Sequence, residues 1–282
     1  MQTVRTLDVL RTTIADLRKA GEQLALVPTM GALHEGHLTL VRRARDAADH
    51  VAVSIFVNPR QFGEGEDLDA YPRQLARDSE LLEAEGVSLL WAPLPAEVYP
   101  DGYATSISVS GVSEALCGAS RPGHFDGVAT GVCKLFNQIM PDLAFFGEKD
   151  WQQLAVIRRM ARDLDLTYPH VEKIVGVPIV REDDGLAMSS RNAYLSREDR
   201  SRAAALPRAM QDAIASLKES ADAGRTLGNL RDMLLAAGFS AVDYAELRDA
   251  DTLAMLQGDN GTARLFVAAR IGNTRLIDNM AV

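Results

Sequence analysis

The feature that most constrains the fold is an alternation of short apolar runs with helical patterns over about the first two thirds of the chain. The apolar runs are rich in Val, Ile, Leu and Phe, which is typical of strands buried on both faces. They lie at residues 23–27, 51–57, 87–91 and 142–146. Helical patterns lie at residues 7–17, 38–48, 73–85, 127–140 and 151–164. Strands that alternate with helices form βαβ units, so the sequence predicts an α/β fold with a parallel sheet and helices on both faces.

The pattern changes after about Pro178. A polar turn, a long helix, a second helix and two strands are expected there, over residues 182–185, 196 to about 220, 227–237, 241–247 and 263–271. The sequence therefore predicts two domains. Residues 1–178 form a Rossmann-like, doubly wound parallel sheet that binds nucleotide and substrate, and residues 179–282 form a smaller C-terminal α+β lid domain.

Charge and hydropathy narrow the class of protein. The 30 Lys and Arg residues face 39 Asp and Glu residues, a net charge of −9 that argues against a nucleic-acid partner. No apolar run approaches the roughly 18 residues that span a bilayer, and the N-terminus lacks the apolar region of a signal peptide. Cys117 and Cys133 form no metal-like pair, so we expect reduced core residues. These features favour a cytoplasmic enzyme or binding protein with no membrane partner.

The most informative motif occupies residues 28–37, Pro-Thr-Met-Gly-Ala-Leu-His-Glu-Gly-His, between a predicted strand and a predicted helix. His34 and His37 therefore lie at a helix start, where free N–H groups and the helix dipole favour a phosphate. The same dipole disfavours added positive charge, so we expect both imidazoles to be neutral. Helix-capping or surface histidines are the ordinary alternative.

Polar segments follow three of the predicted strands, at residues 34–37, 58–61 and 147–150. Because ligands of parallel sheets bind beyond the carboxyl ends of the strands, we expect these segments to converge on one cleft. A further polar segment, Ala-Met-Ser-Ser-Arg-Asn at 187–192, offers two hydroxyls and a guanidinium that could wrap a triphosphate.

Three standard sequence signatures of phosphate, dinucleotide and zinc binding are incomplete in this chain. Residues 118–123 have the glycine spacing of a P-loop, but His124 and Phe125 replace the required Lys and Ser/Thr. The pair Gly63 and Gly65 lacks the third glycine of a dinucleotide-binding fingerprint. The two histidines of residues 34–37 are one residue too close for a zinc-protease motif.

Two motifs together carry a resemblance. His34-x-Gly36-His37 followed by Met188-Ser189-Ser190-Arg191 resembles the two signatures of the nucleotidyltransferase and class I tRNA synthetase superfamily. The segments at residues 28–37, 56–62, 121–125, 146–153 and 186–192 narrow the match. In sequence and order they resemble the pantothenate synthetase family, over a stretch from about Leu26 to Asn279.

The resemblance implies an AMP-forming ligase that condenses (R)-pantoate with β-alanine. ATP and Mg²⁺ would be used, a pantoyl adenylate would form on the enzyme, and the protein would be a homodimer. By resemblance, the catalytic residues are His34, His37, Lys149, Ser189, Ser190 and Arg191, with His37 the nominee for acid catalysis. The implied ATP contacts are Met30, Gly31, Ala32, Leu33, His34, Glu35, Gly36, His37, Gly147, Glu148, Lys149, Asp150, Val180, Met188, Ser189, Ser190 and Arg191. The implied substrate contacts are Gln61 and Gln153, with Pro28, Thr29, Asn58, Tyr71, Arg121 and His124 nearby.

One position departs from the family pattern. Members often show an acidic pair near the metal and phosphates, and here Arg77 precedes Asp78. No metal ligand is therefore assigned, and Asp78 is kept only as a candidate for an indirect contact. We expect Mg²⁺ to be held mainly by the ATP phosphates.

Other interpretations stay open at this point. Lys149 and Asp150 could be an exposed pair at a helix start, and Gln153 could be a surface helix residue. The protein could be another adenylylating enzyme of the superfamily or a nucleotide sensor without turnover. A tRNA synthetase is disfavoured by the acidic charge and the short C-terminal region. Whether His34 and His37 both donate to phosphate, or His37 alone donates a proton, is also open.

Overall fold

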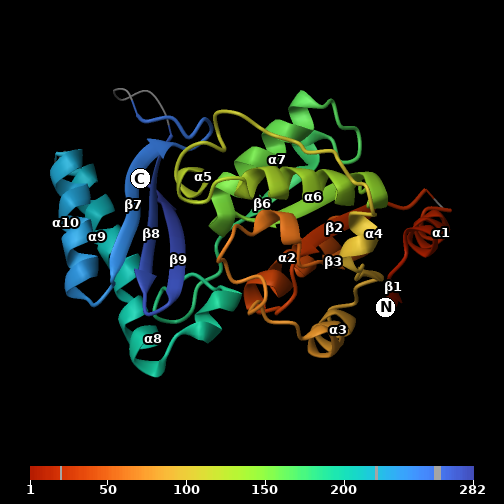
Figure 1. The fold of residues 1–282 in the computed structure, drawn as a ribbon, viewed down its shortest axis with the longest axis horizontal. Helices are drawn as coiled ribbons and strands as arrows, with labels where there is room; N and C mark the ends of the chain where they lie inside the picture. The colour runs from red at the N-terminus through yellow and green to blue at the C-terminus, as the bar shows by residue number, and fades with distance from the viewer. Residues whose placement is uncertain (20, 220–221, 257–261) are drawn as a thin grey trace.

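A six-stranded parallel sheet forms the larger part of the molecule (Figure 1). The computed structural model describes residues 1–19, 21–219, 222–256 and 262–282. The strands of this sheet are β1 (Gln2–Val4), β2 (Leu24–Thr29), β3 (His50–Ile55), β4 (Leu89–Trp91), β5 (Leu143–Gly147) and β6 (Ile174–Val177). They lie in the order β1-β4-β3-β2-β5-β6, and every pair is parallel.

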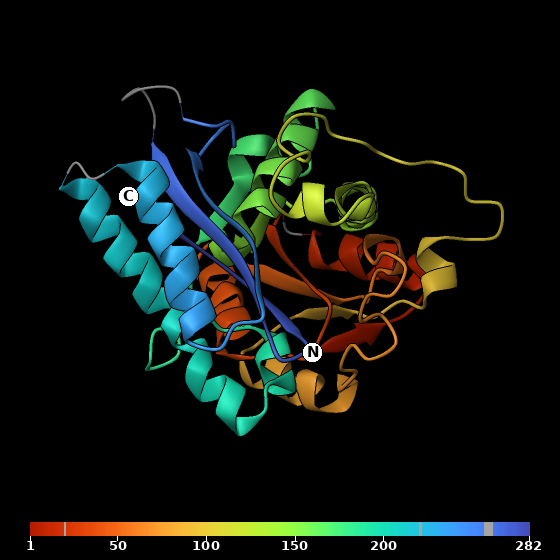
Figure 2. The same cartoon turned by 60° about the vertical axis from the view of Figure 1, so that its left-hand side comes forward.

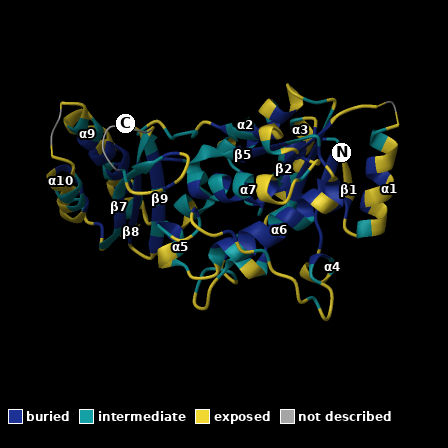
Figure 3. Cartoon of the chain, turned by 90° about the horizontal axis from the view of Figure 1, so that it is seen from above, coloured by how far each residue is buried: buried dark blue, intermediate teal, exposed yellow. Residues whose placement is uncertain are grey.

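Helices cover both faces of this sheet, because successive residues of each strand point to opposite faces. The helices are α1 (Leu7–Leu17), α2 (Glu35–Arg45), α3 (Leu75–Ala84), α4 (Pro95–Val98), α5 (Cys117–Ser120), α6 (His124–Ile139) and α7 (Trp151–Asp163). In β2, Leu24 and Leu26 join the core beneath α1, α6 and α7, whereas Ala25 and Val27 join the core beneath α2 and α3. Buried residues are accordingly concentrated in the strands and along α6 (Figure 3).

The C-terminal part contains three helices and a separate antiparallel sheet, in the order β7-β8-β9. The elements are α8 (Arg197–Ala203), α9 (Ala205–Lys218), α10 (Ala223–Ala236), β7 (Ala241–Asp249), β8 (Ala263–Ile271) and β9 (Thr274–Ala281). Helices α9 and α10 cover one face of the sheet, as the turned view in Figure 2 shows. From the other face, Tyr244, Phe266 and Ala268 pack into the core that includes α6 and α7.

The predicted fold class is confirmed, with corrections to individual elements. Strands β1, β6 and β9 were not predicted. The long helix expected from residue 196 is two helices, α8 and α9, and its expected end at Ser220 lies outside the described residues. Pro207 explains the break, because it has no N–H to donate to the carbonyl of Ala203. The proposed domain boundary after residue 178 stays a prediction. No helix in the described parts of the chain is long and apolar enough to cross a membrane.

Candidate active site

The site lies where β2 and β5 run side by side in the middle of the sheet. The chain leaves β2 for β3 on one side and leaves β5 for β6 on the other. The connecting helices α2 and α7 pack on opposite faces. The two strands therefore separate at their carboxyl ends and leave a crevice for a ligand. His34 and His37 follow β2 at this point, and Lys149 follows β5.

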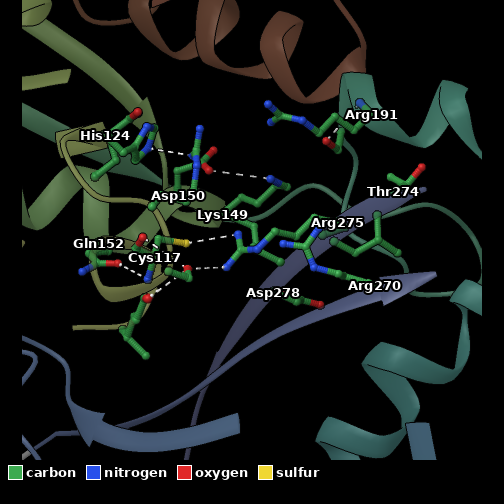
Figure 4. Close-up of a pocket in the computed structure, with 18 of the residues that line it drawn as sticks. Cys117, His124, Lys149, Asp150, Gln152, Arg191, Arg270, Thr274, Arg275 and Asp278 are labelled. Atoms are coloured by element: carbon green, nitrogen blue, oxygen red, sulfur yellow. Dashed lines mark hydrogen bonds and ion pairs between the residues drawn. The ribbon is translucent and has the colours of Figure 1, made fainter. Parts of the chain in front are cut away.

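The predicted polar segments converge on this crevice. A cavity of about 230 Å³ is lined by the predicted residues Pro28, Thr29, Met30, His34, Gly36, His37, Asn58, Gln61, Tyr71, Arg121, His124, Gly147, Lys149, Asp150, Gln153, Val180, Met188, Ser189, Ser190 and Arg191. A neighbouring cavity of about 520 Å³ extends from it toward the antiparallel sheet. Arg121, Lys149 and Arg191 line both cavities, so the two form one continuous cleft between the two sheets. Figure 4 shows Lys149 and Arg191 among the residues that line the larger cavity.

Five predicted nucleotide contacts lie away from both cavity walls: Gly31, Ala32, Leu33, Glu35 and Glu148. Leu33 is buried in the core beneath α2 and α3. The carboxylate of Glu35 pairs with Arg42 on the outside of α2. The backbone carbonyl of Glu148 accepts a hydrogen bond from Asn279 of β9. The roles implied for these five residues therefore stay predictions.

The two histidines cap the start of α2 together. The backbone N–H of His34 donates to Nδ1 of His37 at 3.4 Å. This acceptor role leaves the proton of neutral His37 on Nε2. The ring centroids lie 4.1 Å apart, and Nδ1 of His34 is buried with no hydrogen-bond partner among the described residues. Gly36 permits this arrangement, because a Cβ there would lie 2.9 Å from Cε1 of His34.

Both imidazoles are held neutral. Burial, followed by the nearby Lys149, lowers the pKa of His34 to about 4. Burial, followed by His34 and then Lys149, lowers the pKa of His37 to about 3. The predicted neutrality is confirmed, although desolvation is the main cause rather than the helix dipole. Neutral imidazoles at this position can donate N–H hydrogen bonds to phosphoryl oxygens without carrying charge.

Asp78 shapes the loop that carries the histidines. Its Oδ2 accepts from the N–H of Ala32 at 2.8 Å and its Oδ1 from the N–H of Leu33 at 2.9 Å. Gly31 fits against this carboxylate with φ +84°, where a Cβ would lie 3.0 Å from Oδ2. Both carboxylate oxygens of Asp78 are buried and shape this loop, and its candidacy for an indirect contact with the metal stays a prediction. Arg77 is exposed on the same helix.

The amide side chains lie in the same cavity as the two histidines. Asn58 is buried and holds its neighbours: its Nδ2 donates to the carbonyl of Gly127 at 2.9 Å, and its Oδ1 accepts from Tyr99. The Nε2 of Gln61 donates to the weak acceptor Sδ of Met30, and its Oε1 accepts from Nδ2 of Asn58 at 3.3 Å, so the amide lines the cavity with both ends held. Gln153 lines the cavity from the start of α7.

Arg121 and His124 form a second polar group near the start of α6, where both residues line the two cavities. Nδ1 of His124 lies 2.7 Å from the carbonyl of Gln61, and Nε2 lies 2.9 Å from Nη1 of Arg121. Since an arginine can only donate, His124 carries its proton on Nδ1. Burial, followed by Arg121, lowers its pKa to about 4. His124 therefore positions Arg121, whose other nitrogens bind the carboxylate of Glu66.

The Ser-Ser-Arg segment is returned to the cleft by a short hairpin. Arg181 pairs with Ala187, and Gly185 makes the turn with φ +90°. A short 3-10 helix, η4 (Ser190–Tyr194), follows. In it the hydroxyl of Ser190 lies 3.1 Å from that of Tyr71, and Arg191 forms a two-point ion pair with Asp67.

Sequence reasoning missed Glu66 and Asp67 as partners of the site, and it named Asp78 only as a candidate for an indirect metal contact, not as the residue that shapes the loop. A signal was available for the first two. Residues 64–69 carry four carboxylates directly after the predicted Asn58–Gln61 segment, at the same edge of the sheet. Asp78 gave no comparable signal, since it lies in a helix that contacts the loop only through the fold.

Comparisons with known proteins agree with this geometry. The family model described as pantoate-beta-alanine ligase matches residues 2–281. The pantothenate synthetase of Novosphingobium aromaticivorans is 66% identical, covering 100% of this chain and 99% of that protein. The pantothenate synthetase of Sphingopyxis alaskensis is 56% identical, with 100% of each chain covered.

Solved structures share the fold. A crystal structure of pantothenate synthetase from Thermus thermophilus superposes with a TM-score of 0.92 at 46% identity, covering 99% of each chain. Pantoate-beta-alanine ligase from Francisella tularensis, complexed with beta-gamma ATP and β-alanine, gives a TM-score of 0.84 at 33% identity, covering 100% of this chain and 97% of that one. The chain is therefore an enzyme that belongs to the pantoate-beta-alanine ligase family.

Proposed function

We propose that the protein condenses (R)-pantoate with β-alanine at the expense of ATP, through a pantoyl adenylate. The observation that carries the proposal is the composition of the cleft. Hydrogen-bond donors and cations for phosphates (His34, His37, Lys149, Ser189, Ser190 and Arg191) share one cavity with the amides of Gln61 and Gln153. Amides suit the hydroxyls and carboxylate of a small hydroxy acid.

In the first step, a carboxylate oxygen of pantoate attacks the α-phosphorus of ATP. The bond from the α-phosphorus to the bridging oxygen breaks, and pyrophosphate leaves with the electron pair. Charge accumulates on the phosphoryl oxygens, and fixed donors stabilise it without reorganising. The Nε2–H of His37 and the ammonium of Lys149 are such donors, and Arg191 would pair with the departing pyrophosphate once its guanidinium leaves Asp67.

In the second step, the free amine of β-alanine attacks the acyl carbon of the adenylate. The bond from the acyl carbon to the AMP oxygen breaks, AMP leaves, and the nitrogen loses a proton to form the amide. Water competes with the amine at this stage, so the intermediate needs an enclosed site. The cleft between the two sheets would enclose the adenylate on several sides. We propose that closure of the lid domain over the cleft then excludes water.

Mg²⁺ is proposed to enter with the ATP phosphates rather than on protein ligands. Among the described residues, no group of three or more His, Cys, Asp or Glu could hold a metal ion. Each oxygen of the Asp78 carboxylate already accepts one backbone N–H. The proposal also includes a cytoplasmic homodimer, as the family resemblance implies.

One assay tests the reaction. Isotope exchange between ATP and pyrophosphate should require pantoate, and AMP release should require the later addition of β-alanine. Exchange supported by another acid but not by pantoate would assign a different adenylylating enzyme. Nucleotide binding without exchange would assign a sensor.

A further inference from the structure

Two adjacent acidic residues occupy the two arginines that line both cavities, Arg121 and Arg191. Glu66 accepts two hydrogen bonds from Arg121, one of them from Nε at 2.7 Å. Asp67 accepts two from Arg191, from Nε and Nη2, both at 2.9 Å. All four side chains are largely buried, with 17% to 29% of each exposed. We call Glu66 and Asp67 the acidic clip.

The clip belongs to the connection between β3 and α3, which reaches across the cleft. Besides Asp67, this connection contacts the Ser-Ser-Arg region through Tyr71, whose hydroxyl lies 3.1 Å from that of Ser190. The carbonyl of Ala70 also accepts from Tyr194 at 3.3 Å. The connection between β3 and α3 therefore binds two segments through consecutive carboxylates. Asp67 binds Arg191 in η4, and Glu66 binds Arg121 just before α6.

A carboxylate in a two-point pair presents the same geometry to a guanidinium as a phosphate does. Arg121 and Arg191 line both cavities, so a phosphate-bearing ligand there would compete with the clip for the same nitrogens. Lys149 also faces a carboxylate, that of Asp150 at 3.7 Å. Arg121, Arg191 and Lys149 thus each lie beside a carboxylate of the protein itself.

We propose that the acidic clip is an internal anionic ligand, and that Asp67 is a positioning residue that weakens pyrophosphate binding by holding Arg191. The inference rests on the proposed function in one respect: the release of pyrophosphate that the ion pair would favour follows adenylation. When the phosphate leaves Arg191, Asp67 takes its place and prevents rebinding. The ion pair itself is a feature of the free protein and can be tested without turnover.

The test measures the affinity of the protein for inorganic pyrophosphate by titration calorimetry. The Asp67→Asn variant keeps the size of the side chain and removes the charge that competes for Arg191. If the clip holds Arg191 most of the time, its removal should tighten pyrophosphate binding about tenfold, because the apparent affinity scales with the fraction of competent protein. Asp67→Glu keeps the charge and should bind about as weakly as the unaltered protein.

The matched control is Glu64→Gln. Glu64 lines the same cavity and lies in the same connection, but it has no ion pair among the described residues. The control loses one negative charge without freeing an arginine, so it should change the affinity less than about twofold, as expected for a screened charge. An equal increase in pyrophosphate affinity in Asp67→Asn and Glu64→Gln would show that net charge alone causes the effect, and it would contradict the proposal.

A second comparison places the effect on Arg191. In an Arg191→Ala background, Asp67→Asn should leave pyrophosphate affinity unchanged, since no arginine remains to be freed. Unchanged or weaker binding in the single Asp67→Asn variant overturns the proposal, because Asp67 would then orient Arg191 for the ligand rather than compete with it. Absence of pantoate-dependent exchange would overturn the proposed reaction alone, since pyrophosphate affinity is measured separately.

Discussion

Residue by residue, the chemistry of the cleft depends on histidines that do not carry charge. His37 is half-buried beside His34, accepts the backbone N–H of His34 at Nδ1, and presents Nε2–H as its donor. Protonating either ring would place a cation beside Lys149 in a desolvated site, which is why both pKa values are low.

Removing this donor should slow the reaction more than it weakens nucleotide binding. We expect His37→Ala to lower turnover by about 10²- to 10⁴-fold, the usual scale for a positioned donor. ATP affinity should fall only modestly, because several other groups line the same cavity. Steady-state kinetics with a nucleotide titration checks both quantities. Near-normal turnover would assign the essential donor to His34 instead.

The same histidines should make the protein less stable in mild acid. In the unfolded chain they bind protons below about pH 6.5, whereas folded His34 and His124 stay neutral down to about 4 and His37 to about 3. Between these values the unfolded state binds more protons, so the free energy of unfolding decreases as the pH falls. Each histidine contributes up to about 1.4 kcal/mol per pH unit in that window.

Urea titrations at about pH 7 and about pH 5.5 measure this slope. The variant His37→Asn should reduce the slope by about 1 kcal/mol per pH unit, because one neutral buried histidine is gone. Equal slopes in the two proteins would show that His37 is already charged when folded.

At this scale the sequence predicted which side chains meet but not which of them are free. Gln152 and Gln153 are adjacent, yet Gln152 is buried at the wall of the larger cavity and donates to the carbonyls of Val112 and Ala115, whereas Gln153 lines both cavities. Both read alike in the sequence. The difference arises from the orientation of α7 against α5, which is a property of the packed fold.

Among the elements, the loop between β2 and α2 depends on helix α3 for its shape. Asp78→Asn leaves the side chain one acceptor for two backbone N–H groups, and its own NH₂ then faces the second. We expect a loss of about 2–4 kcal/mol of stability, the scale for a buried charged acceptor, together with weaker ATP binding. Arg77→Ala, at the exposed neighbouring position, should change stability by less than about 0.5 kcal/mol. Denaturation experiments and nucleotide titrations of the Asp78→Asn and Arg77→Ala variants test this prediction.

Helix α6 depends on close approach at Gly127, where it meets the 3-10 turn η1 (Pro59–Gln61). A Cβ at Gly127 would lie 2.0 Å from the carbonyl oxygen of Arg60 and 2.6 Å from the backbone nitrogen of Gln61. Gly127→Ala should therefore displace Gln61, lower stability by about 2–3 kcal/mol and weaken pantoate binding more than ATP binding.

The matched control lies in α10, where a Cβ at Gly228 would meet nothing within 4 Å. Gly228→Ala should stabilise the protein by up to about 1 kcal/mol, the helix-propensity difference. Thermal unfolding and substrate titrations of Gly127→Ala and Gly228→Ala distinguish the steric effect of the close approach from the effect of helix propensity. A stabilised Gly127→Ala variant would contradict the close approach.

Elements with long apolar patterns were predictable, and those with short or interrupted ones were not. Strand β1 has only three residues, too few for a periodicity. Strand β9 follows the two-residue turn Gly272-Asn273, a hairpin signal that was present in the sequence but not used. The break between α8 and α9 at Ala204 was likewise predictable, because Pro207 cannot donate to the carbonyl of Ala203.

For the molecule as a whole, the antiparallel sheet supports the loop that carries Lys149. Nδ2 of buried Asn279 donates to the carbonyls of Glu148 and Lys149, at 2.9 and 3.0 Å. Asn279→Asp removes both donors and turns a carboxylate toward two carbonyls. We expect a loss of about 2–4 kcal/mol of stability and slower adenylation, measured by denaturation and pyrophosphate exchange. Asn273→Asp, in the exposed turn of the same sheet, should change neither.

The pairing of β2 with β5 has a consequence for how the chain folds. Leu26 pairs with Ala144, and the N–H of Leu24 reaches Asp142 across a sequence separation of 118 residues. Bringing such distant segments together carries a loop-closure entropy that local hairpins and helices avoid, so this pairing forms slowly. His37 and Lys149 follow these two strands and meet only when the pairing is complete. During refolding, affinity for ATP should consequently arise with the slowest kinetic phase, after most of the helical signal has recovered.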